Sequence, residues 1–412
     1  TYPLPVGAYS QVALPMADDW DPFAADEPAP KPAAANLPND TAAASGGVAS
    51  LEKEDIDEVS KEIMARIKAE KPWEIALDPS PDVTWHEPTC TLDDWRHKDV
   101  RLEVGRGIAM LIFNRAEQNN TLQDSIGAGV NDVLFDLHKR KDMRVAVFTG
   151  EGRMYSAGGD PKGWQSAAAR LRGEVLDGDG TVANRIEYKP VGEAVGASMG
   201  SLMERSYKAG AHNKGPVSIG QLTTAKQWHT WYTLPQFTIC LVNGSAMGGG
   251  VGCVCCCDYV IAVKRAFFVL SEVKIGVIPA TISPYVIAKI GASNAKRFFC
   301  AAENLSATRA KDYGIVDEVV ENMKEGHERI QEIVKLISQC GPRAVAGYKE
   351  IVLGTSGVPL GKALAHYTCR MQSSAADSDE LKVGLEAEKA SSKPAWEAEV
   401  IGFDEWPMVG VK

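Results

Sequence analysis

The sequence lacks several patterns that would place it in whole classes of protein. No run of apolar residues reaches the roughly 20 that a membrane-spanning helix requires, so we expect no membrane span. Basic residues form no stripe, and the formal net charge of -10 argues against nucleic acid as a partner. The histidines show no metal-ligand spacing, and no nucleophile–histidine–acid order is recognisable. We therefore expect no metal site and no catalytic triad.

The nine cysteines also lack the spacing of a disulfide framework. Four of them are crowded together, without the second ligand pair that a zinc site needs: Cys253, Cys255, Cys256 and Cys257. We interpret these four as small apolar residues that pack in a helix. Unpaired thiols in this number indicate an intracellular, reducing compartment, and cytosol, mitochondrion and plastid all remain open.

The N-terminal part of the chain differs in composition from the rest. Residues 1–50 are rich in proline, alanine and acids, which predicts a flexible tail. Residues 51–95 predict an amphipathic helix followed by a linker. The apolar face of that helix covers either its own domain or a partner protein, so the N-terminal part is a candidate contact with another protein.

One stretch, from Pro235 to Gly291, organises the remainder. The apolar run 237–242 predicts a fully buried strand, and the glycine triplet 248–250 then leads into a small-residue helix. Glycines at a strand-to-helix junction let a ligand approach bare backbone, where the first helical amides have no partners. Such amides can hold an anion or a developing oxyanion. Glu272 follows two further predicted strands and would supply proton transfer beside them.

The surrounding pattern is that of an α/β layered fold. Residues 101–104 and 108–113 predict a hairpin, 121–140 a helix and 145–148 a strand. Strands alternating with helices indicate layers of both kinds. After Gly291 the spacing of apolar residues predicts mostly helix.

Several motifs together resemble the crotonase (enoyl-CoA hydratase/isomerase) superfamily. The segment 154–162, Met-Tyr-Ser-Ala-Gly-Gly-Asp-Pro-Lys, is similar to that superfamily's Ala-Gly-x-Asp-hydrophobic-Lys signature. The segment 243–250, Asn-Gly-Ser-Ala-Met-Gly-Gly-Gly, is similar to its second signature, and Ser271-Glu272 and Gly276-Val277-Ile278-Pro279 follow in the expected order. The likeness covers roughly residues 100–397, with the N-terminal 95 residues outside it.

The resemblance implies an α/β fold, a crotonase-like spiral of ββα turns with a C-terminal helical region that builds trimers or hexamers. It divides the chain into a spiral core at 96–310, a helical region at 311–397 and a tail at 398–412. It also implies that the amides of Gly159 and Gly249 hold a thioester oxygen and that Glu272 is catalytic. Ala157, Lys162, Gly248 and Pro279 match substrate-binding positions, and no cofactor is implied beyond the coenzyme A or carrier-protein thioester itself.

The resemblance leaves the reaction open. Hydratases of this superfamily with two glutamates carry one of them where this chain has Gly252, so Glu272 is left as a single acid. The residues around it resemble those of a one-glutamate subgroup that includes methylglutaconyl-CoA hydratases and polyketide β-branching dehydratases. We expect a hydratase or dehydratase of an enoyl thioester with a branched, glutaconyl-like chain. The alternatives are a double-bond isomerase and a non-catalytic accessory subunit of a larger complex.

Overall fold

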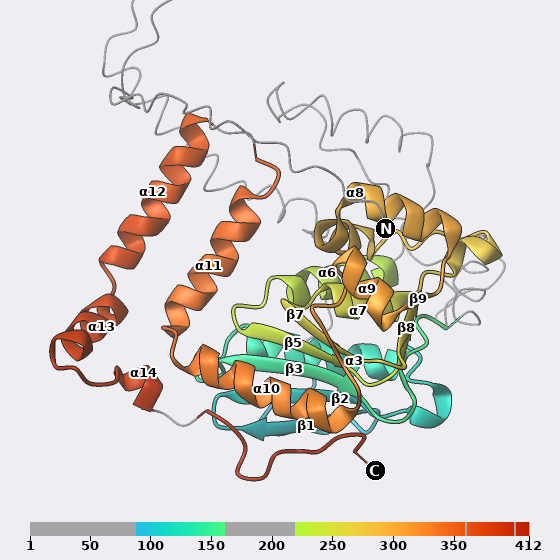
Figure 1. The fold of residues 1–412 in the computed structure, drawn as a ribbon, viewed down its shortest axis with the longest axis horizontal. Coiled ribbons are helices and arrows are strands. Elements are labelled where there is room, and N and C mark those ends of the chain that lie inside the picture. The colour runs from blue at the N-terminus through green and yellow to red at the C-terminus, as the bar shows by residue number, and fades with distance from the viewer. Residues whose placement is uncertain (1–87, 123, 161–218, 359–360, 399–400, 412) are drawn as a thin grey trace, which may run out of the picture. The chain divides into compact units, whose positions relative to one another are not determined.

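The computed structural model of the chain describes residues 88–122, 124–160, 219–358, 361–398 and 401–411. The first three strands lie in one sheet, the next five alternate between a second sheet and the first, and a helix follows each later pair of strands. This order gives a spiral of ββα turns, which confirms the α/β fold expected from the sequence (Figure 1). The predicted N-terminal tail and amphipathic helix, and residues 163–218, lie outside the described residues.

The first sheet has six strands in the order β1-β2-β3-β5-β7-β10. Its strands are β1 (Val100–Gly105), β2 (Ile108–Phe113), β3 (Val145–Gly150), β5 (Phe237–Val242), β7 (Tyr259–Val263) and β10 (Glu318–Val320). The β1–β2 pair is the antiparallel hairpin predicted from the sequence, and the other pairs are parallel. Strands β2 and β3 are buried along their whole length, and β5 is buried except at its first residue. Continuous apolar runs predict such burial for parallel sheets.

The second sheet is smaller. Three of its strands each follow, along the chain, directly after a strand of the first sheet. It has the order β4-β6-β8-β9, formed by β4 (Met154–Ser156), β6 (Ser245–Met247), β8 (Phe267–Val269) and β9 (Leu305–Ser306). Each of these strands is three residues long or shorter. The segments that sequence analysis singled out for function lie on or directly after three of these strands.

Helices connect and cover the sheets. The helices of the core are α3 (Asp124–Leu137), α6 (Ile219–Tyr232), α7 (Gly249–Cys255), α8 (Ser283–Ala301), α9 (Ala307–Tyr313) and α10 (Met323–Ser338), with short 3-10 turns η1 (Ala116–Gln118) and η2 (Glu272–Ile275). Helix α8 begins before the predicted start at 292 and continues through a kink at Gly291, whose φ is +74°. Figure 1 shows α10 lying across the first sheet.

The chain after α10 is helical, as predicted. It forms α11 (Pro342–Thr355), α12 (Lys362–Ala376), α13 (Asp379–Lys389) and the short α14 (Ala395–Ala398). The last described residues then return to the core, where Gly402 pairs with Arg106 and Val409 is buried. The domain boundaries at 310 and 397 remain predictions, although the first sheet itself continues to Val320 in β10.

Among the described residues, no helix is both long enough and apolar enough to cross a membrane. The four crowded cysteines are all buried around α7, in agreement with their interpretation as packing residues.

Candidate active site

The site begins where β6 gives way to α7. Gly248 is the residue before the helix, with φ +50° and ψ −121°, a backbone conformation that residues with a side chain rarely adopt. Its amide donates to the carbonyl oxygen of Val269 in β8 at 2.9 Å, which fixes the turn against the second sheet. The amide of Gly249, the first helical residue, therefore sits at the helix N-terminus, where no intrahelical acceptor exists.

A second glycine turn lies against the first. Gly158 has φ +83°, its amide donates to Ser156 Oγ at 3.1 Å, and its carbonyl oxygen accepts from the amide of Leu122 at 2.8 Å. A methyl group built on Gly158 would lie 2.5 Å from the carbonyl oxygen of Met247, so the two turns touch through bare backbone. Only glycine permits this approach.

The contact brings the two predicted amides together. A methyl group on Gly158 would lie 3.1 Å from the amide nitrogen of Gly249, and one on Gly249 would lie 3.8 Å from the amide nitrogen of Gly159. Neither Gly159 nor Gly249 donates its amide to a backbone acceptor within the described residues. Two unsatisfied amides at one place form a site for a negatively charged oxygen.

Glu272 reaches this place from the other side. It is the first residue of η2 and is only 5% exposed. Its Oε1 lies 2.8 Å from the position that a methyl group on Gly248 would take, so the carboxyl group rests against the glycine turn. Its Oε2 is buried without a hydrogen-bond partner among the described residues. Burial raises the pKa of Glu272 above its ordinary value, opposed by a hydrogen bond to its own backbone amide.

The position of the second acid found in two-glutamate hydratases is closed by packing. Gly252 lies on α7, and a methyl group built there would approach Ile282 Cγ2 to 2.4 Å. Ile282 is itself buried, just before α8. The space into which a side chain at Gly252 would project is thus already filled by the hydrocarbon of Ile282.

The remaining predicted site residues are placed differently. Ala157 is half-buried beside Gly158, and its amide donates to the carbonyl oxygen of Asn119 at 2.9 Å. Pro279 is half-buried in the loop after η2. Lys162 lies outside the described residues. The structure therefore brings Gly159, Gly248, Gly249 and Glu272 together.

Residues that sequence analysis did not select hold these turns in place. Asn120 is fully buried with φ +50°; its Nδ2 donates to the carbonyl oxygens of Glu151 and Met154 at 3.0 and 2.9 Å. Leu122 forms a parallel bridge with Gly159 and lies against Gly249. Two adjacent asparagines, Asn119 and Asn120, are the one sequence signal that could have indicated a left-handed turn here.

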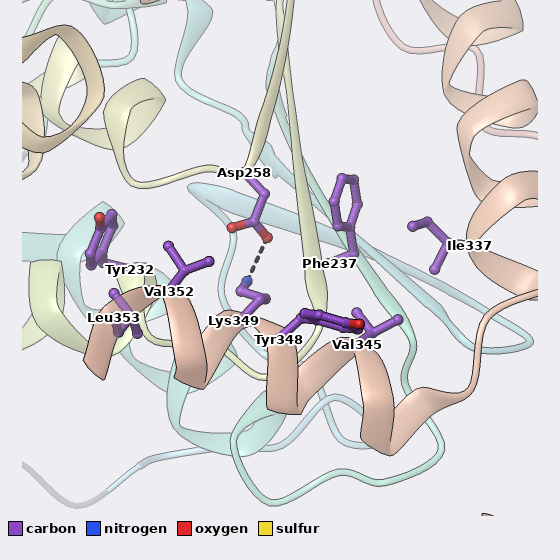
Figure 2. Close-up of a pocket in the computed structure, with 9 residues that line it drawn as sticks. All are labelled: Tyr232, Phe237, Asp258, Ile337, Val345, Tyr348, Lys349, Val352 and Leu353. Atoms are coloured by element: carbon purple, nitrogen blue, oxygen red, sulfur yellow. Dashed lines mark hydrogen bonds and ion pairs between the residues drawn. The ribbon is translucent and has the colours of Figure 1, made fainter. Parts of the chain in front are cut away.

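A separate cleft of about 340 Å³ lies where α11 meets the first sheet (Figure 2). Figure 2 shows the ion pair between Lys349 and Asp258 at its centre, with Nζ and Oδ2 2.5 Å apart. The side chains around that pair are otherwise mostly apolar, among them Phe237 and Val352. Neither Glu272 nor the site glycines line this cleft, so it is no part of the candidate active site.

Comparison with known proteins agrees with this geometry. Residues 103–180 and 197–399, more than half of the chain, match the family described as enoyl-CoA hydratase/isomerase. An enoyl-CoA hydratase of Alternaria alternata is 31% identical over 121 residues, which cover 29% of this chain and 41% of that protein. The peroxisomal Delta(3,5)-Delta(2,4)-dienoyl-CoA isomerase of Arabidopsis thaliana is 23% identical over 296 residues, 72% of this chain and 94% of that one.

The fold has close counterparts among solved structures. The crystal structure of an enoyl-CoA hydratase from Shewanella pealeana matches 73% of this chain and 97% of its own, with a TM-score of 0.58 at 23% identity. The ββα spiral and the paired glycine turns agree with the family match. The chain belongs to the enoyl-CoA hydratase/isomerase family and is an enzyme of the crotonase superfamily.

Proposed function

We propose that the protein adds water to an enoyl thioester, or removes it, with Glu272 as the single general acid and base. The observation that carries this proposal is the buried Glu272 Oε2 without a partner, beside two amides without acceptors. In this role the amides of Gly159 and Gly249 hold the thioester carbonyl oxygen as it gains negative charge. Each such donor lowers the barrier by on the order of 3 kcal/mol.

The chemistry requires two proton transfers on one face of the substrate. The carboxylate of Glu272 takes a proton from water as the oxygen attacks C3, and electrons move onto the thioester oxygen. The same carboxyl group then returns the proton to C2, which restores the carbonyl and leaves the carboxylate as it began. A carboxyl group with a raised pKa suits both steps, because it exchanges protons nearer to neutral pH.

The closed space at Gly252 supports a one-glutamate mechanism. Any side chain at that position would have to displace Ile282, so a second carboxylate has no room on this face of α7. The isomerase alternative also needs only one carboxyl group, which would carry a proton from C2 to C4. The similarity of the chain to a dienoyl-CoA isomerase supports this alternative.

The substrate assignment rests on the sequence resemblance. We propose a branched, glutaconyl-like acyl chain carried on coenzyme A, with a carrier protein as the other possible carrier. Ala157, Lys162, Gly248 and Pro279 are the proposed contacts. Because the amide of Ala157 already donates to Asn119, its carbonyl oxygen is the atom left to meet a substrate.

Turnover of 3-methylglutaconyl-CoA and crotonyl-CoA by the full chain tests the proposal. Hydration should be lost in Glu272→Gln while circular dichroism remains that of the wild type. Full hydration by that variant would disprove the role of Glu272. A 3-enoyl thioester in heavy water separates the alternatives, since an isomerase gives a deuterated 2-enoyl product to which no oxygen is added.

The protein is proposed to work as a homotrimer or hexamer in an intracellular, reducing compartment. Helix α11 has no buried residue, and Tyr348 and Val352 on it are 71% and 58% exposed. Large apolar side chains exposed on one helix favour burial against another copy. All nine cysteines are free thiols, which supports a reducing compartment.

A further inference from the structure

A second cluster of polar side chains lies where the segment before β1 meets helix α3. It consists of Cys90, His97 and Asp132, each of which offers one potential ligand atom within 4.8 Å of the other two. Cys90 and Asp132 are buried and His97 is half-buried. The proposed catalytic chemistry uses none of the three. Because Cys90 and Asp132 are 42 residues apart, no short spacing pattern in the sequence points to this cluster.

One oxygen of the cluster is crowded. Asp132 Oδ2 accepts from the amide and the hydroxyl of Thr89 at 3.0 and 2.7 Å. His97 Nε2 lies 2.8 Å from the same oxygen, and Cys90 Sγ lies 3.5 Å from it. A carboxylate oxygen offers about two lone-pair directions. Four groups that can donate therefore converge on two lone pairs, and of these groups only the imidazole and the thiol can change role and offer a lone pair instead.

We propose that Cys90, His97 and Asp132 form a binding site for a divalent cation of the zinc class. With a cation between them, the imidazole nitrogen and the thiolate sulfur no longer compete as donors to one oxygen but each present a lone pair to the metal. One lone pair of Asp132 Oδ2 then faces the metal and the other accepts from Thr89, which orients the carboxylate as supporting bonds do around metal ligands.

The distances are close to those of a tetrahedral centre. Ligand bonds of about 2.0–2.3 Å place neighbouring ligand atoms roughly 3.3–3.7 Å apart. Of the observed distances to Asp132 Oδ2, the 3.5 Å from Cys90 Sγ lies within that range and the 2.8 Å from His97 Nε2 lies below it. A cation therefore requires the imidazole to withdraw by about half an ångström. Three protein ligands leave a fourth position for water.

The donor set selects the metal. A thiolate beside an imidazole suits zinc or cobalt and disfavours calcium and magnesium, which prefer oxygen ligands. Binding releases the thiol proton of Cys90 to solvent, and the imidazole binds in its neutral form. The thiolate and the carboxylate then carry two negative charges, which balance the cation and leave a buried site without net charge.

The cation would join two parts of the chain that are now held by hydrogen bonds. The amide of Leu92 donates to Asp136 Oδ2 at 2.9 Å, beside the contacts of Asp132. The segment that carries Cys90 and His97 precedes residue 103, where the family match begins. The proposed metal thus links a segment outside the family match to α3.

Cobalt titration of the chelator-treated full chain tests the site, because cobalt bound to a thiolate gives a charge-transfer absorption band. One equivalent of Co²⁺ should produce this band together with the visible bands of a tetrahedral centre. Zn²⁺ should displace the Co²⁺ and remove these bands. Cys90→Ser should abolish the band. The matched variant Cys300→Ser, which changes an exposed cysteine elsewhere, should retain it.

A second variant keeps the test decisive if Cys90→Ser folds poorly. His97→Gln retains the thiol and should weaken cobalt binding tenfold or more, and Zn²⁺ should raise the Tm of the wild type but not of this variant. Absence of a stoichiometric cobalt band in the wild type would overturn the proposal. So would a band that survives Cys90→Ser, and the cluster would then be a hydrogen-bonded clasp alone.

Discussion

Glu272 combines two properties that rarely occur together in a carboxyl group, deep burial and an oxygen without a partner. Burial disfavours the charged form, so the pKa of Glu272 is raised above its ordinary value of 4.5. The proposed base must be ionised to take a proton from water. We therefore expect kcat/KM for hydration to fall, as pH is lowered, at a pH above 4.5. A profile that stays flat down to that value would contradict the role of Glu272 as base.

The same pKa predicts how stability depends on pH. A raised pKa in the folded state means that the native protein binds the proton more tightly than the unfolded chain does. The stability that this contributes is present at low pH and is lost as pH rises through the folded pKa. Glu272→Gln removes the buried charge, so its gain in Tm over the wild type should grow with pH and vanish in acid. Thermal unfolding of both proteins across the pH range measures this, and a variant less stable than wild type at high pH would contradict it.

Because Gly248 has no side chain, the carboxyl group of Glu272 can rest against its backbone. In Gly248→Ala the new methyl group would lie 2.8 Å from Glu272 Oε1, so the carboxyl group must move. We expect hydration to fall by at least tenfold.

Gly314→Ala provides the matched control for that change. Gly314 also has a positive φ, +85°, but a methyl group there would make only an ordinary contact, 3.6 Å from the carbonyl oxygen of Lys289. It should lose about 1–2 kcal/mol of stability from backbone strain and keep its turnover. Equal turnover in the two variants would show that the methyl group at Gly248 does not disturb the site.

At the scale of elements, the contact between α7 and Ile282 is what closes the second acid position. Gly252→Ala places a methyl group 2.4 Å from Ile282 Cγ2 and should cost about 1–3 kcal/mol through overpacking. Ile282→Ala should recover part of that loss when combined with it, because the two side chains compete for one space. Urea unfolding of the two single variants and the double variant measures the coupling. Additive losses would contradict the packing argument.

The elements differ in how well the sequence predicts them. The strand at 237–242 was predicted with its observed ends, because a continuous apolar run between turn residues has few other interpretations. Strands β4, β6 and β9 were not predicted, since two or three residues cannot show a period. The sequence predicts a start of helix α8 that is too late, because Gly291 is typical of a helix boundary although the helix continues through it with a kink.

The candidate site shows the same limit. Glu272, Gly159 and Gly249 could be selected because each stands in a recognisable local motif. Ile282 could not, since its role depends on a contact with Gly252 that only the packing of α7 against the segment before α8 creates. Side chains that act through distant contacts leave no local pattern in one sequence.

At the scale of the whole molecule, the C-terminal helices carry apolar side chains that a single chain does not cover. Tyr348 and Val352 on α11, and Leu381 and Leu385 on α13, are all exposed. Helix α11 is nevertheless fixed to the sheet, since Lys349 Nζ donates to the carbonyl oxygen of Gln236 at 2.7 Å and pairs with Asp258. Tyr348 and Val352 line the cleft beside that ion pair and remain open to water, as a surface that meets another copy requires.

This arrangement predicts the effect of one charge on assembly. We expect the wild type to sediment as a trimer or hexamer and Tyr348→Asp to sediment as a smaller species, because an unpaired carboxylate is costly inside an apolar interface. Val411→Asp changes an exposed apolar residue outside these helices and should leave the wild-type assembly intact. Sedimentation velocity at several concentrations measures all three proteins. A monomeric wild type would contradict the proposed assembly, and an unchanged Tyr348→Asp would place the contact on another face.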